Sequence, residues 1–251
     1  MPNYYVAIDD TDRAEDDGRG QGTGAKSRAF ARELLEAVDG RQLGITRHQL
    51  LIDPAVPYTS HNSSACIVVE SGVERGWVIE TMVEIGRLYL PEIASPGADV
   101  GLCVAEESQI GDAVVEWGRR AKVEVVTMDE AHEIAGEAGI RLEGLTGDKV
   151  GVIGALAAVG LRRSGRDGRF LELGELRRAI GEQPAAVFMD AGVQRFVSGE
   201  DDVELAPDEL ISVGHKHAQP VLLDGQPTLL LDPSSRRGGW RAAPRESVKS
   251  Y

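Results

Sequence analysis

The sequence is poor in aromatic residues, which make up only 5% of its 251 residues. Hydrophobic residues still account for 42%, so a core must be built mainly from Val, Leu, Ile and Ala. No apolar run approaches the roughly 20 residues that a membrane span requires. The N-terminus leads from one short apolar stretch into an acidic segment, which is not a signal-peptide pattern. We therefore expect a cytoplasmic protein of one large domain or two smaller ones.

Cysteine and positive charge are also scarce. The two cysteines, Cys66 and Cys103, lie in apolar runs without zinc-ligand spacing, so we expect buried free thiols. The formal net charge is −14. Because nonspecific nucleic-acid binding depends on Lys and Arg that neutralise phosphates, this balance predicts weak RNA binding unless basic residues gather in one place.

Strand-like runs alternate with amphipathic helical segments in the first part of the chain. We predict strands at 4–8, 45–52, 65–69, 100–105 and 123–126, and helices at 24–38, 76–88, 110–117 and 128–138. This order predicts a mixed, layered fold of the α/β and α+β kind.

A junction at 141–149 separates this region from a second one. We expect domains at 1–140 and 141–232, the second beginning with a helix of small residues at 150–159 and continuing with strand-like runs at 169–173, 185–197 and 210–231. The basic segment 233–251 is predicted to be a flexible tail; a nucleic-acid patch around Trp240 is the alternative. His215 and His217 have no third ligand nearby, which favours solvated loop histidines over a metal pair.

Three carboxylates follow the first predicted strand. Asp9, Asp10 and Asp12 lie where residues 4–8 end, and ligands of open α/β sheets bind at the carboxyl ends of strands. Carboxylates this close together repel one another unless a cation neutralises them, and Mg²⁺ prefers oxygen ligands. An acidic turn that only caps a helix is the alternative. The segment that follows favours a magnesium-phosphate site.

That segment, residues 18–24, reads Gly-Arg-Gly-Gln-Gly-Thr-Gly and leads into a predicted helix. Glycines let backbone N–H groups converge on an anion, and the helix N-terminus adds a partial positive charge. Thr23 offers a hydroxyl at the helix N-cap, and Lys26 a cation nearby. A glycine loop without a ligand is the alternative.

A P-loop is a weaker interpretation of the same residues. The segment 20–27 nearly fits its pattern, but Ala25 stands in place of the second glycine. In addition, an acidic loop separates the segment from the strand, which a P-loop usually leaves directly.

Four stretches agree, in order, with one known family. They are Ile8-Asp9-Asp10-Thr11-Asp12 with the glycine turn to Thr23, Pro-Ala-Val-Pro-Tyr at 54–58, Ser-Pro-Gly at 95–97, and Gly-Val-Ile-Gly-Ala-Leu-Ala-Ala-Val-Gly at 151–160. Together they resemble the archaeal agmatinylcytidine synthetases, which modify the anticodon of an isoleucine tRNA. The resemblance implies a kinase-like domain that binds ATP and Mg²⁺ at 1–140, followed by a ferredoxin-like domain at 141–232. In that family, ATP activates a cytidine carbonyl and agmatine displaces the activated oxygen.

The resemblance, read with the local pattern, assigns the candidate site. The family's reactive threonine falls on Thr23 and its metal-binding aspartates fall on Asp9, Asp10 and Asp12. The expected catalytic residues are Thr23, Asp9 and Asp12; the expected ATP-binding residues are Gly20, Gly22, Thr23, Gly24, Lys26 and His61.

The chain departs from the family where the family is basic. Thr59 to Ser63 stand in place of Lys-Thr-Arg-Gly-Asn, and Asp148-Lys149-Val150-Gly151 in place of Lys-Gly-Arg-Gly. The family also continues into an oligonucleotide-binding domain and a zinc ribbon. The two cysteines of this sequence cannot form that zinc site. We therefore expect a small amine or guanidino compound to be the substrate, and tRNA to be disfavoured.

The expected function is an ATP- and Mg²⁺-dependent enzyme that activates an oxygen by phosphoryl or nucleotidyl transfer, for displacement by an amine or guanidino compound. Two alternatives remain. One is tRNA cytidine modification with the RNA held by a partner. The other is a non-catalytic module that senses a nucleotide or an amine.

Overall fold

The computed structural model describes residues 1–12, 22–56, 62–234 and 239–248. The chain divides into two compact units, which we call the first unit (Met1–Ser164) and the second unit (Gly165–Tyr251). The predicted mixed α/β class is confirmed. The division falls after Ser164 and not after residue 140, because the helix at 152–164 packs on the sheet of the first unit.

The first unit is built on an antiparallel sheet with the strand order β5-β4-β1-β3-β2. Its strands are β1 (Asn3–Asp9), β2 (Gly40–Gln49), β3 (Ser63–Ser71), β4 (Gly101–Glu106) and β5 (Arg141–Gly144). The succession β1-α1-β2-β3-α2-β4 with this order is the split βαβ arrangement of ferredoxin-like folds. That arrangement therefore lies in the first unit, whereas the resemblance placed it after residue 140.

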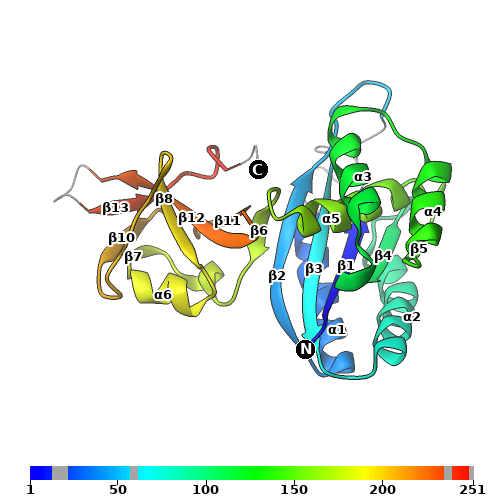
Figure 1. The fold of residues 1–251 in the computed structure, drawn as a ribbon, viewed down its shortest axis with the longest axis horizontal. Coiled ribbons are helices and arrows are strands. Elements are labelled where there is room, and N and C mark those ends of the chain that lie inside the picture. The colour runs from blue at the N-terminus through cyan, green and yellow to red at the C-terminus, as the bar shows by residue number, and fades with distance from the viewer. Residues whose placement is uncertain (13–21, 57–61, 235–238, 249–251) are drawn as a thin grey trace. The chain divides into compact units, whose positions relative to one another are not determined.

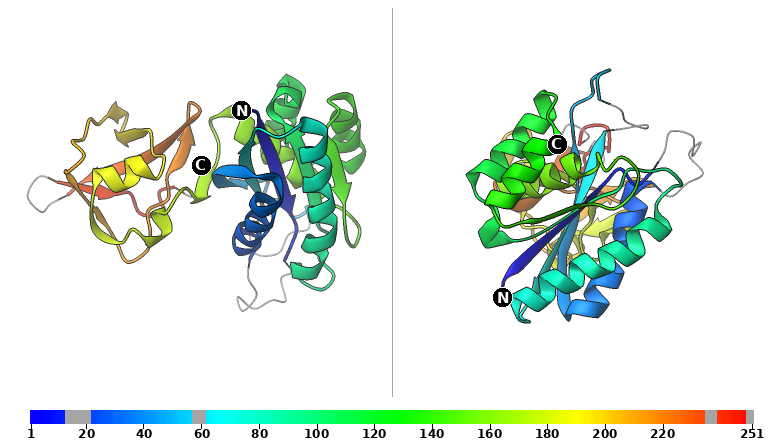
Figure 2. Two further views of the ribbon diagram at one scale, coloured as in Figure 1. Left: turned by 90° about the horizontal axis from the view of Figure 1, so that it is seen from below. Right: turned by 90° about the vertical axis from the view of Figure 1, so that its right-hand side faces the viewer.

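Helices cover both faces of this sheet (Figures 1 and 2). One face carries α1 (Thr23–Val38) and α2 (Arg75–Ile93); the other carries α3 (Asp112–Val123), α4 (Met128–Glu137) and α5 (Val152–Ser164). A short 3₁₀ helix, η2 (Glu107–Gln109), follows β4. Helix α5 lies against β1, β3 and β4 and is in turn covered by α3.

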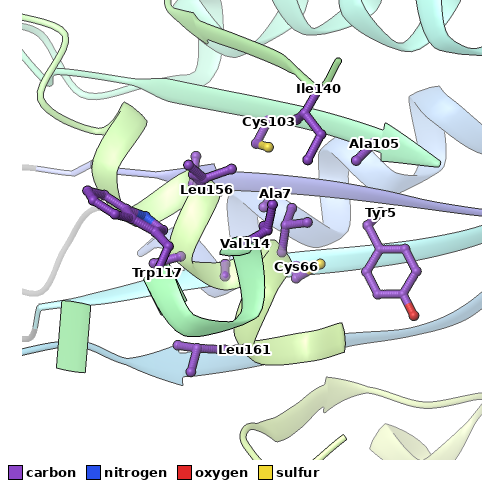
Figure 3. Packing of buried hydrophobic residues seen from close by; sticks show 14 of the residues in the cluster. Tyr5, Ala7, Cys66, Cys103, Ala105, Val114, Trp117, Ile140, Leu156 and Leu161 are labelled. Atoms are coloured by element: carbon purple, nitrogen blue, oxygen red, sulfur yellow. The ribbon is translucent and has the colours of Figure 1, made fainter. Parts of the chain in front are cut away.

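The core beneath α5 is made mainly of small and branched side chains, together with the two aromatic residues Tyr5 and Trp117 (Figure 3). Cys66 and Cys103 belong to this core as free thiols, as predicted. Burial raises the pKa of Cys66 to about 12, so this thiol behaves as a small apolar side chain. Among the described residues, no helix is both long and apolar enough to span a membrane.

The second unit consists mainly of strands. They are β6 (Arg169–Glu172), β7 (Gly181–Pro184), β8 (Arg195–Ser198), β9 (Asp201–Asp202), β10 (Leu210–Val213), β11 (Val221–Leu223), β12 (Gln226–Pro233) and β13 (Trp240–Ala242). Two short helices, η3 (Leu176–Arg178) and α6 (Ala185–Asp190), lie between them. The pairing runs β6-β11-β12-β13-β10-β7, and β8 adds to β12 in parallel. A separate core of apolar side chains, including Phe170, Phe188 and Ile211, holds these elements together.

Three sequence-based predictions of elements are wrong. The predicted strand at 123–126 does not form, because α3 continues to Val123 and leaves Val125 exposed. Residues 185–190 form helix α6, which buries Ala185 and Phe188 one turn apart. The predicted flexible tail contains β13, where Arg241 forms an ion pair with Asp232.

The first prediction concerns the contact of α5 with α3. A Cβ atom at Gly160 would collide with the backbone carbonyl of Val114. We expect Gly160→Ala to lower the free energy of unfolding by about 1–3 kcal/mol, as overpacking does. The control is Gly136→Ala in α4, where a Cβ meets nothing within 4 Å and should raise stability by up to about 1 kcal/mol. Equal effects in urea unfolding would contradict the close-contact interpretation.

Candidate functional site

The candidate site begins where strand β1 ends, at Asp9. Its side chain faces α5, and Gly154 of that helix lies so close that a Cβ there would collide with the Asp9 carboxylate. The small-residue segment at 151–160 is therefore a close-packing surface, which places a helix over this carboxylate. On the same sheet face, the β1–β3 pairing ends at Ile8 and Ala65, so the neighbouring Ser64 lies at this end of β1; Ser64 is also paired with His48 of β2.

This row of polar side chains is buried. His48 and Ser64 are 0% and 1% exposed. The Nε2 atom of His48 lies 2.8 Å from the hydroxyl of Thr46, whereas the Ser64 hydroxyl has no hydrogen-bond partner among the described residues. A buried hydroxyl without a partner is unfavourable, so this end of β1 retains an unused hydrogen-bonding group. Neither His48 nor Ser64 was identified from the sequence. Polar residues in or next to two predicted strands could, however, have indicated a buried polar site.

The environment of Asp9 disfavours its charged form. Part of the residue remains exposed, but its carboxylate is enclosed by protein atoms. This desolvation raises the pKa of Asp9 to about 7, and the nearby charges of Asp10 and Asp12 contribute in the same direction. A hydrogen bond from the backbone N–H of Asp10 acts in the opposite direction. Asp10 itself has a φ of 50°, a left-handed conformation that turns the chain away from the strand.

Asp12 instead lies at the start of α1 and makes close hydrogen bonds. Its Oδ1 atom accepts from the hydroxyl of Thr23 at 2.7 Å and from the hydroxyl of Thr11 at 2.8 Å. Its Oδ2 atom lies 3.3 Å from the backbone nitrogen of Thr23. The N-cap residue is Gly22, and Thr23 is the first residue of the helix. The predicted capping role of Thr23 is thus wrong: Asp12 caps the helix, and the Thr23 hydroxyl donates to it.

Lys26 lies on the first turn of α1 and is 5% exposed. Its ammonium group donates to the backbone carbonyl of Thr11 at 2.5 Å and to the hydroxyl of Ser95 at 3.0 Å. The same carbonyl accepts from the backbone N–H of Ser95 at 2.9 Å. Lys26 therefore ties the loop after β1 to the loop after α2. Its predicted contact with phosphate stays a prediction.

Arg47 is a residue of this region that the sequence analysis missed. It lies on β2, where its Nε atom donates to the hydroxyl of Ser63 at 2.8 Å. Burial lowers the pKa of Arg47, and the carboxylate of Asp12 opposes this effect. In β2, Arg47 alternates with Thr46 and His48, so its side chain points to the opposite face of the sheet, which α1 covers. A positively charged residue within the predicted strand 45–52 could have marked this position in the sequence.

The three aspartates do not form one metal-ligand cluster. Across the described ranges, no group of three or more His, Cys, Asp or Glu side chains is placed to hold a metal ion. Asp9 faces α5, whereas Asp12 faces α1. The donor set still suits Mg²⁺, since this ion is commonly held by one or two carboxylates together with phosphate oxygens. The assignment of Asp9, Asp10 and Asp12 as joint ligands stays a prediction.

The remaining predicted residues divide into two groups. Gly22 and Gly24 lie at the N-terminus of α1, next to Thr23. A Cβ at Gly22 would lie 3.6 Å from Oδ2 of Asp12, an ordinary van der Waals contact, so the structure gives no steric requirement for glycine there. Gly20 and His61 fall outside the described residues.

Comparisons with known proteins support the resemblance at the level of the fold. No protein-family model and no curated protein matches the chain. The crystal structure of TiaS in complex with an isoleucine tRNA, AMPCPP and agmatine matches with 23% identity and a TM-score of 0.50, over 64% of this chain and 36% of that chain. The complex of TiaS with the same tRNA and ATP matches with 25% identity, a TM-score of 0.48 and the same coverages. Apo TiaS, a tRNA agmatidine synthetase, matches with 25% identity and a TM-score of 0.46, over 63% and 35%.

The chain spans about a third of the length of these structures. The first of the three, at a TM-score of 0.50, shows a shared fold.

The second prediction follows from the burial of Asp9. Its pKa is about 7 in the folded protein and about 3.9 in an unfolded chain, so the folded state binds the proton more tightly. The contribution of Asp9 to the free energy of unfolding is therefore greatest below about pH 4, and it is lost as the pH rises through about 7. Each pH unit between the two pKa values corresponds to about 1.4 kcal/mol, and since the residue is partly exposed we expect a loss of about 2–3 kcal/mol.

Asp9→Asn should remove this dependence, because the amide is neutral at every pH. The measurement is urea unfolding of both proteins between about pH 5 and about pH 8.5 in the presence of EDTA, a range chosen to cover the upper part of this titration. Parallel stability curves for the two proteins would contradict the raised pKa.

Proposed function

We propose that the chain is an ATP- and Mg²⁺-dependent enzyme of the ligase or phosphotransferase kind, which activates an oxygen atom for displacement by an amine or guanidino compound. The fold that it shares with TiaS supports a nucleotide reaction, since TiaS has been solved with AMPCPP and agmatine. The site at the end of β1 supplies groups suited to such chemistry.

The observation that carries this proposal is the 2.7 Å hydrogen bond from the Thr23 hydroxyl to Asp12. A hydroxyl becomes a better nucleophile when a base accepts its proton, and Asp12 lies where it would act as that base. The pair lies at the N-terminus of α1, whose partial positive charge favours a phosphate group. Arg47 adds a positive charge on the same side of the sheet.

Mg²⁺, when bound, would neutralise phosphate charge in this region. Asp9 and Asp12 are the residues that would hold it. Asp12 would also orient Thr23, and Lys26 would fix the loop that carries Thr11. In phosphoryl transfer most of the rate gain comes from positioning and charge neutralisation, which is what these groups provide.

The third prediction tests whether the Thr23 hydroxyl takes part in the chemistry. Thr23→Ser keeps a hydroxyl and should retain ATP turnover. Thr23→Asn keeps a donor for Asp12 but has no hydroxyl, and Thr23→Ala has neither. We expect Asn and Ala to reduce turnover at least a hundredfold, or roughly 2.7 kcal/mol of barrier.

Stability separates this outcome from a structural role. Loss of one hydrogen bond lowers the free energy of unfolding by about 1 kcal/mol. A structural Thr23 would therefore make the Ala variant less stable and leave the Asn variant as active as the unmodified protein. ATP turnover and thermal unfolding should be measured on the same preparations.

A second candidate function is modification of a tRNA cytidine. The specific observation in its favour is that the TiaS structure with which the fold is shared is a complex with an isoleucine tRNA. The expectation that tRNA is disfavoured rested on net charge and on missing basic residues, and the comparisons do not support it. In this function the activated oxygen would belong to the RNA, and the amine would be agmatine or a similar guanidino compound.

The fourth prediction separates the two acceptors. With Mg²⁺ and agmatine but without RNA, we expect the full chain to turn over ATP with water as the acceptor of the transferred group, and we expect no more than a twofold change when bulk tRNA is added. A tenfold or larger rise that needs tRNA would make the second function the leading one. Saturable ATP binding without turnover under all conditions would indicate a sensing module, and chelation of Mg²⁺ serves as the negative control.

A further inference from the structure

Three basic side chains from distant parts of the sequence meet in the second unit. Arg177 comes from η3, His217 from the segment between β10 and β11, and Arg245 from the segment after β13. The Nη2 atom of Arg245 lies 3.0 Å from Nε2 of His217, and Nη1 of Arg177 lies 3.4 Å from the same nitrogen. The same Nη2 atom also lies 3.3 Å from Nδ1 of His217, so the guanidinium group of Arg245 lies against the edge of the ring that carries both nitrogens. The ring therefore bridges two arginines of like charge.

The two positive charges are not neutralised locally. Neither Arg177 nor Arg245 forms an ion pair with a described residue, whereas the neighbouring Arg178 pairs with Glu175 at 2.7 Å. The pKa of Arg245 is lowered by burial and by the charge of Arg177, and Glu246 has only a smaller opposite effect. Two guanidinium groups held together repel each other.

Arg245 also retains an unused donor. Its Nε atom is buried and has no hydrogen-bond partner among the described residues. A buried donor without a partner is unfavourable, so an acceptor bound beside this guanidinium group would relieve that cost. In a chain of net charge −14, carboxylates are abundant, yet none of the described ones pairs with Arg177 or Arg245.

We propose that Arg177, His217 and Arg245 form a binding site for a phosphate group. Arginine presents a planar set of N–H donors that fits phosphate oxygens, and an anion would remove the repulsion between the two guanidinium groups. Arg177 is exposed and His217 and Arg245 are half-buried, so a ligand can reach the cluster from solvent. Donors arriving from separate segments suit the several oxygens of a phosphate better than the two of a carboxylate. The phosphate belongs either to a free phosphate or phosphomonoester, or to a nucleic-acid strand.

This site is independent of the proposed function, since all three residues belong to the second unit and the ATP-site residues belong to the first. Its occupation can therefore be tested whether or not the chain turns over ATP.

The fifth prediction is made for the full chain labelled with ¹⁵N. Inorganic phosphate, titrated at constant ionic strength, should shift the side-chain Nε–H signals of Arg177 and Arg245 in a saturable way. We expect Arg177→Gln and Arg245→Gln each to weaken this binding at least tenfold. Arg178→Gln is the matched control, because it removes the same charge from the same short helix and should leave the affinity unchanged within twofold.

The backbone amide spectrum shows whether each variant is folded, and the exposed Arg177 keeps the test available if Arg245→Gln does not fold. A second titration uses a short single-stranded RNA without a terminal phosphate. Tighter binding of this RNA than of inorganic phosphate, lost in Arg177→Gln, assigns the site to a nucleic-acid backbone; the reverse order assigns it to a free phosphate or phosphomonoester. Shifts that stay linear, or that are equal in Arg177→Gln and Arg178→Gln, would overturn the proposal.

Discussion

Helix α5 approaches the end of strand β1 so closely that a Cβ at position 154 would displace the Asp9 carboxylate. This contact has consequences for both packing and electrostatics. It is one of two close approaches of α5: Gly154 meets side chains at the end of β1, and Gly160 meets the backbone of α3. It also removes water from the Asp9 carboxylate and so raises its pKa. One packing constraint therefore sets both the position of the helix and the protonation of the first aspartate.

The carboxylate of Asp12 differs from that of Asp9 in its contacts. Asp12 accepts hydrogen bonds from two hydroxyl groups and lies at the positive end of α1. Lys26 stabilises this arrangement, because it fixes the carbonyl of the intervening Thr11. The site thus depends on two separate restraints, one on each face of the sheet.

Local sequence pattern was sufficient for much of this arrangement. The apolar run that forms β1 and the acidic and glycine-rich residues after it indicated that Asp9 ends a buried strand and that Thr23 begins a helix, but not that Asp9 and Asp12 face different helices. The mixed α/β class followed from the alternation of elements. The prediction failed for α6, because a short helix that buries Ala185 and Phe188 and a buried strand present the same few apolar residues. It also failed for β13, because this strand forms by pairing with β12 and with the more distant β10, and the sequence of β13 alone does not show these partners.

Residues whose roles depend on distant partners were harder to recognise. Lys26 looked like a phosphate ligand because its neighbours in sequence are glycines, yet its ammonium group bonds to Ser95, which lies far along the chain. Arg47 was missed because its partner Ser63 and the charge of Asp12 come from other elements. Sequence distance hides such contacts, since long-range hydrogen bonds leave no periodic pattern.

Net charge, like sequence distance, does not show which side chains lie close together in the folded protein. A balance of −14 suggested a chain with little attraction for phosphates. Screening, however, confines the interaction of exposed charges to about 8–10 Å at physiological salt. Within that distance, Arg177 and Arg245 both contact His217 without a described carboxylate paired to either, and only the charge of Asp12 opposes the effect of burial on the pKa of Arg47. The electrostatic attraction of a phosphate group therefore depends on these local basic side chains and not on the net charge of the chain. An acidic protein can accordingly contain separate places that favour anions, provided that the fold keeps their basic side chains apart from its many carboxylates.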